Sequence, residues 1–73
     1  MLDMESFGRR LAFLRRQSRL TQRKIAEACC VTVQAVSKWE LGRSCPDILI
    51  LDDLAKSLGV TISELFEQEN HIA

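Results

Sequence analysis

The segment between residues 20 and 43, LTQRKIAEACCVTVQAVSKWELGR, constrains the fold more than any other part of the chain. Thr21 and Thr32 each precede a short run with helical spacing, where a threonine hydroxyl can accept hydrogen bonds from the backbone N–H groups of the first turn. The apolar residues that share one face are Ile25, Ala26 and Cys29 in the first run, and Val36 and Trp39 in the second. The segment therefore predicts two short helices in succession, the second of which ends at Gly42.

Only Cys30 and Val31 separate the first of these helices from the cap of the second. A connection of this length is too short for antiparallel neighbours, so the two helices must cross steeply, as in a helix-turn-helix unit. In such a unit the second helix presents the side chains of its first turns outward. The outward positions are Val33, Gln34, Ser37 and Lys38.

These four side chains suit the floor of a DNA major groove. Gln34 can form a bidentate pair with adenine, and Lys38 can donate to a guanine edge or to a phosphate. Val33 offers methyl groups to a thymine methyl, and Ser37 can donate or accept a hydrogen bond. The alternative for each is a side chain that only faces water. Trp39 lies three residues after Val36, which favours a core position over base stacking.

The combination of TQ, IA, VTVQAVSKWE and a glycine followed four residues later by proline resembles the phage-repressor (Cro/CI-like) helix-turn-helix domain of the XRE family of transcriptional regulators. The resemblance extends from about residue 7 to residue 66. It implies an all-α fold, namely a compact five-helix lambda-repressor-like DNA-binding domain with the helix-turn-helix at its second and third helices.

The resemblance also implies a structural pair and marks two departures. An arginine seven residues before the TQ glutamine pairs in this family with the glutamate before the turn glycine, and these are Arg15 and Glu40 here. The pair would clamp the second helix of the motif to the scaffold and would read no base. Arg19 and Cys30 stand where the family often has glycine. If these turns keep a positive φ, each side chain costs about 1 kcal/mol.

Three further side chains are expected to contact DNA phosphates. Gln22 begins a helix, where its backbone N–H and its amide would both meet a passing phosphate. Arg43 lies just beyond Gly42, and Arg10 lies on a basic helix predicted for residues 6–18 with Ser6 as its cap.

The second half of the chain predicts two more helices. Asp47 can cap a helix over residues 48–58 that Gly59 ends, and Thr61 can cap a last one. The predicted core face of the first consists of Ile48, Leu51, Ala55 and Leu58. Leu49 and Ile50 fall off this face, so we expect them in the contact of a weak twofold homodimer. Two copies would read a palindromic operator with half-sites roughly 34 Å apart.

Charge is divided unequally along the 73 residues, although the net charge is zero. Residues 1–43 hold nine Lys/Arg and four Asp/Glu, a net charge of +5, whereas residues 44–73 hold one lysine and six acidic residues, a net charge of −5. The basic half coincides with the helix-turn-helix, as expected for a nucleic-acid partner. The apolar share of 47% argues against disorder.

Other function classes receive little support from the sequence. The only histidine, His71, lies far from any nucleophile, three cysteines lack metal-ligand spacing, and the longest aliphatic run is too short for a bilayer. We therefore expect a non-enzyme in the cytoplasm that needs no cofactor, metal or membrane. The chain divides into an N-terminal arm (1–5), a helix-turn-helix domain (6–66) and a polar tail (67–73).

The sequence thus predicts a sequence-specific regulator of transcription that binds double-stranded DNA, with repression as the expected action. A second interpretation stays open: a helix-turn-helix scaffold that binds proteins, as an antitoxin-like or adaptor module, through its acidic half. The division of charge favours the first.

Overall fold

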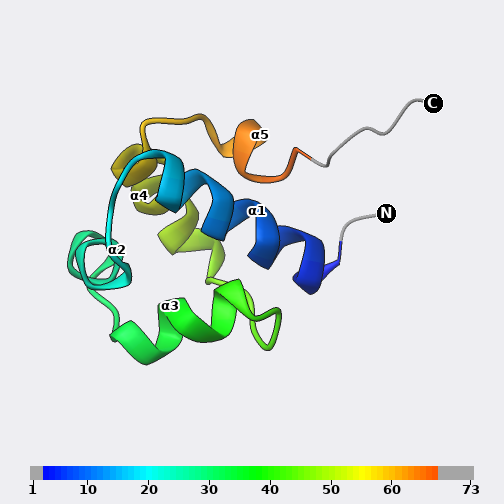
Figure 1. The fold of residues 1–73 in the computed structure, drawn as a ribbon, viewed down its shortest axis with the longest axis horizontal. Helices are drawn as coiled ribbons and strands as arrows, with labels where there is room; N and C mark the ends of the chain where they lie inside the picture. Colours follow the sequence, from blue (N-terminus) through cyan, green and yellow to red (C-terminus); the bar gives the residue numbers. More distant parts are fainter. Residues whose placement is uncertain (1–2, 68–73) are drawn as a thin grey trace.

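The computed structural model describes residues 3–67, and within them the chain forms helices joined by turns and loops, with no strand (Figure 1). The five helices are α1 (Met4–Gln17), α2 (Gln22–Cys29), α3 (Val33–Glu40), α4 (Ile48–Leu58) and α5 (Ile62–Leu65). The long α1 crosses the molecule, with α3 and α5 on opposite sides of it, and α2 packs against both α3 and α4. The predicted all-α class and the order of the five helices are confirmed.

The start of α1 differs from the prediction. Asp3 is the N-cap, and its carboxylate accepts a hydrogen bond of 2.7 Å from the backbone N–H of Ser6. The proposed cap at Ser6 was therefore wrong, and Ser6 lies inside the first turn, where its hydroxyl donates to the same carboxylate. A charged acceptor interacts more favourably with the positive end of the helix dipole than a hydroxyl does.

The helix-turn-helix has the predicted caps and turns. The hydroxyl oxygen of Thr21 accepts a hydrogen bond from the backbone N–H of Lys24, and that of Thr32 accepts one from the backbone N–H of Ala35, both at 3.1 Å. Cys30 ends α2 in the left-handed conformation at φ +57°, and Arg19 has φ +58° in the preceding turn. Both non-glycine residues thus retain the backbone geometry expected of the glycines that they replace.

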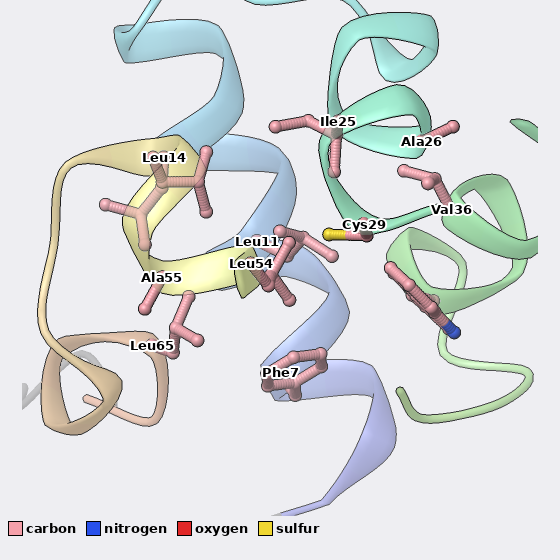
Figure 2. Close-up of a cluster of buried hydrophobic side chains, with 12 residues drawn as sticks. Phe7, Leu11, Leu14, Ile25, Ala26, Cys29, Val36, Leu54, Ala55 and Leu65 are labelled. Carbon is pink, nitrogen blue, oxygen red and sulfur yellow. The ribbon is translucent and has the colours of Figure 1, made fainter. Parts of the chain in front are cut away.

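The core draws side chains from all five helices toward the middle of α1 (Figure 2). Leu11, Ile25, Val36, Leu54 and Leu65 are fully buried. Trp39 is also buried, so its predicted core position is confirmed.

The predicted core face of α4 is right in part. Ala55 and Leu58 are buried and Leu51 is half-buried, but Ile48 is 79% exposed. Leu54, which was not predicted, is fully buried. Ile48 lies on the same side of the helix as these residues, but it is in the first turn of α4. Helical spacing alone does not show how far along a helix the core extends.

Close packing joins α1 to α3 and α5. A Cβ atom at Gly8 would lie against the carbonyl oxygen of Trp39 and 2.6 Å from that of Glu40, so glycine allows α1 to approach the end of α3. On the other side, the rings of Phe7 and Phe66 lie 5.2 Å apart. A capping box formed by Thr61 and Glu64 starts α5.

Candidate nucleic-acid interface

Arg15, Gln22 and Glu40 bring three helices together at the end of α3. Arg15 donates from Nε to Glu40 Oε2 at 2.6 Å and from its second terminal nitrogen to Oε1 at 3.2 Å. The amide of Gln22 donates to the same Oε1 at 2.9 Å. The other terminal nitrogen of Arg15 donates to the carbonyl of Leu20, in the turn before α2. The predicted contact between Arg15 and Glu40 is present, and it forms part of a larger network that fixes the orientation of α3.

Gln22 has a role that the sequence did not reveal. Its side-chain amide is directed to Glu40 and not outward. Its backbone N–H belongs to the first turn of α2, in which only the Lys24 N–H has a described cap partner. Contact of Gln22 with a phosphate through this backbone donor stays a prediction.

The four candidate base-reading residues differ in exposure. Gln34 and Lys38 are exposed on α3. Ser37 is half-buried, and Val33 is half-buried and packs against the core. Val36 and Trp39 fill the opposite face of the helix. The exposed face of α3 is therefore narrower than predicted, with Gln34 and Lys38 at its centre.

The two arginines expected at phosphates occupy different environments. Arg43 is exposed in the loop after α3, and its backbone N–H bonds to the carbonyl of Lys38 at 2.9 Å. Arg10, in contrast, donates from Nε to the Glu64 carbonyl at 3.0 Å and forms an ion pair with Glu67. These contacts direct Arg10 to the end of α5 and give it a structural role, so its contact with a phosphate stays a prediction.

The apolar surface at the start of α4 also differs from the prediction. Leu49 is 84% exposed, as expected, but Ile50 packs partly against the core. The exposed pair is Ile48 and Leu49, preceded along the chain by Leu41, which is 59% exposed at the end of α3. The hydrogen bond from the Leu49 N–H to the Asp47 carboxylate caps this first turn.

The titratable groups of residues 3–67 include one cysteine with a raised pKa and no cluster that could hold a metal ion. Burial raises the pKa of the Cys29 thiol, and the negative charge of Asp53 raises it further, which disfavours the nucleophilic thiolate form. No three side chains of histidine, cysteine or acidic type come together in this part of the chain. Its helices are also too short and too polar to cross a membrane.

Comparison with known proteins agrees with this geometry. The family model described as helix-turn-helix (HTH_3) matches residues 11–65. The chain is 39% identical over 66 residues to the HTH-type transcriptional activator BcrR of Enterococcus faecalis, a match that covers 90% of this chain and 32% of BcrR. It is 38% identical over 61 residues to the HTH-type transcriptional regulator PuuR of Escherichia coli K12, covering 84% of this chain and 33% of PuuR.

A similar solved structure is that of the restriction-modification controller protein C.AhdI of Aeromonas hydrophila. The TM-score is 0.81 at 28% identity, and the match covers 86% of this chain and 96% of C.AhdI. The chain spans about a third of the length of the two curated relatives, whereas it spans nearly all of C.AhdI. The match of the family model over residues 11–65, together with the identity to these regulators, shows that the chain belongs to the helix-turn-helix family of the phage-repressor, or XRE, type.

Proposed function

We propose that this domain is a sequence-specific, double-stranded DNA-binding regulator of transcription whose α3 enters the major groove. The observation that carries the proposal is the division of α3 into two faces. Val36 and Trp39 attach one face to the core, while Gln34 and Lys38 are exposed on the other. Both exposed side chains have hydrogen-bonding groups that match base edges.

The dimensions of α3 support this docking. An α-helix with its side chains is about 10–12 Å across, which fits a major groove about 12 Å wide, and the eight residues of α3 extend about 12 Å along it. The network around Glu40 fixes the far end of the helix, so that its orientation is set before DNA arrives. A preorganised helix loses less conformational freedom on binding.

Phosphate contacts would fix the register of α3 in the groove. The backbone N–H of Gln22 at the start of α2 and the exposed guanidinium of Arg43 are the groups that we assign to this role. Val33 and Ser37 are assigned to the edge of the reading surface because they are half-buried.

We propose a twofold dimer on a palindromic operator, since one α3 spans only a few base pairs. The exposed residues Ile48 and Leu49 are the proposed contact. Occupying a promoter is sufficient to block transcription, so we propose repression, in the cytoplasm where the DNA lies, with no catalytic step. BcrR is named an activator, and a promoter–reporter fusion with and without the protein distinguishes the two actions.

The experiment that tests this function is selection of bound fragments from random duplex DNA, followed by affinity measurements at increasing salt. We expect an enriched palindromic motif and an affinity that falls steeply with salt. Failure to bind any duplex at low salt would overturn the proposal and favour the protein-binding alternative, in which the acidic second half is the working surface.

A further inference from the structure

Arg19 occupies a backbone conformation that disfavours its side chain. Its φ of +58° lies in the left-handed region, and Cys30 is the only other non-glycine residue between residues 3 and 67 with a positive φ. An L-residue with a Cβ atom is strained in this region, whereas glycine is not. Arg19 is exposed, so packing of its side chain against the core does not compensate for this strain.

The side chain of Arg19 also has no hydrogen-bond or ion-pair partner among the described residues. The same holds for three neighbours, Arg16, Arg23 and Lys24, which are all exposed. These four cations, which we call the corner cluster, lie within nine consecutive residues at the turn between α1 and α2. Arg10, Arg15 and Lys56 differ, since each pairs with a carboxylate, whereas Lys38 and Arg43 also lack such a partner among the described residues.

Hydrogen bonds attach the corner cluster to the proposed interface. Arg15 donates to the carbonyl of Leu20, the residue after Arg19, and through its other nitrogens it holds Glu40 at the end of α3. Gln22, the residue before Arg23, donates to Glu40 as well. The turn that carries Arg19 therefore lies beside the two helix ends that we assign to DNA contact.

We propose that Arg19, together with Arg16, Arg23 and Lys24, contacts the sugar-phosphate backbone of duplex DNA beside the sites of Gln22 and Arg43. The inference rests on the proposed function and adds a contact surface to it. A polyanion with closely spaced phosphates matches four neighbouring cations that have no partner among residues 3–67, and each neutralised phosphate releases counterions. In this proposal the free energy that backbone strain at Arg19 costs the fold is offset by the free energy that its phosphate contact adds to DNA binding.

Arg19→Gly separates this role from folding. Glycine removes the cation and relieves the left-handed strain, so thermal stability should rise while affinity for DNA falls. We would measure binding of the whole chain to a mixed-sequence duplex of about three helical turns, which needs no knowledge of the operator. The affinity should fall roughly five- to tenfold at 0.1 M salt, and the magnitude of the salt slope should fall by about 1 for each bound copy.

Two matched variants provide the controls. Cys30→Gly relieves the same strain in the other turn without removing a charge, so it should raise thermal stability and leave the salt slope unchanged. Arg19→Lys keeps the cation, and it should retain most of the affinity. A wild-type affinity and slope for Arg19→Gly, or an equal loss for Arg19→Lys, would overturn the inference. If the wild-type protein binds no duplex at all, the failure is that of the proposed function itself.

Discussion

Arg15 Nε and Glu40 Oε2 form an ion pair at 2.6 Å that links the first helix, α1, to the third, α3. Only 17% of the Arg15 side chain and 8% of the Glu40 side chain are exposed. The two residues are 25 positions apart, so the pair joins α1 directly to the end of α3. All described donors around the Glu40 carboxylate come from Arg15 and Gln22. The orientation of α3 therefore depends on a charge that is largely removed from water.

Glu40→Ala should destabilise the fold more than it weakens DNA binding measured well below the melting temperature. Removing the carboxylate leaves the Arg15 guanidinium unpaired in a largely buried position, at a cost of roughly 2–4 kcal/mol. Thermal unfolding measures the loss. A double-mutant cycle with Arg15→Ala should give a clear coupling energy, and additive effects would show that the two residues do not act as a pair.

Gly8→Ala should also destabilise the domain, although alanine is the better helix former. The added methyl group would overlap the carbonyl oxygens of Trp39 and Glu40, which are backbone atoms and cannot rotate away. Overpacking of this kind costs roughly 1–3 kcal/mol. Chemical denaturation measures the change, and Gln17→Ala on the exposed end of α1 is the control, with an expected effect near zero. Equal stability of the two variants would contradict the close approach of α1 to α3.

Local chemistry made most of the fold predictable from the sequence. Thr21, Thr32, Asp47 and Thr61 all cap helices as expected, because a cap depends on one side chain and the backbone that follows it. The start of α1 was misplaced because two residues of capping type, Asp3 and Ser6, lie three positions apart there, and only their relative geometry decides which of them is the cap.

The candidate site was less predictable because it depends on contacts between distant residues. Helical spacing indicated that Arg10 is outside the core, but not that it would meet α5, which lies 54 residues away along the chain. In the same way the sequence did not show that Gln22 would bond to Glu40 or that Ile50 would pack against the core. The clamp between Arg15 and Glu40 was predicted only because a family resemblance supplied the long-range pairing.

Gln34→Ala should reduce discrimination between sequences. The amide of Gln34 is exposed on the outer face of α3, where it can pair with both polar groups of an adenine edge. We expect a loss of roughly 1–3 kcal/mol on the selected site and a relaxed preference at one or two base pairs. Competition binding with selected and scrambled duplexes measures this difference. An equal loss on both duplexes would exclude Gln34 as a reader.

Arg43→Ala should weaken binding to every duplex by a similar factor. Arg43 is exposed beyond the end of α3, and a phosphate contact carries no sequence information. The magnitude of the salt slope should fall by roughly 1 for each half-site. Arg10→Ala is a matched comparison, since its guanidinium is held by α5: it should change stability, and its salt slope tests the phosphate contact predicted for Arg10. An unchanged slope for Arg43→Ala would remove it from the interface.

Ile48→Lys combined with Leu49→Lys should abolish cooperative filling of a palindromic site. These two side chains are 79% and 84% exposed at the start of α4, and burying them against a second copy would remove apolar surface from water. Two lysines would instead place four positive charges at the twofold axis. Because the expected dimer is weak in free solution and is completed on DNA, the measurement is stoichiometry and cooperativity on a palindromic duplex and on a single half-site. Phe13→Lys, which changes a half-exposed apolar residue on α1, is the control and should retain wild-type cooperativity. Affinity for the single half-site should not fall in the double variant, since Gln34 and Lys38 are untouched and the added lysines can only strengthen attraction to the phosphates. Wild-type cooperativity in that variant would show that the dimer contact lies on another surface or that the domain binds as a monomer.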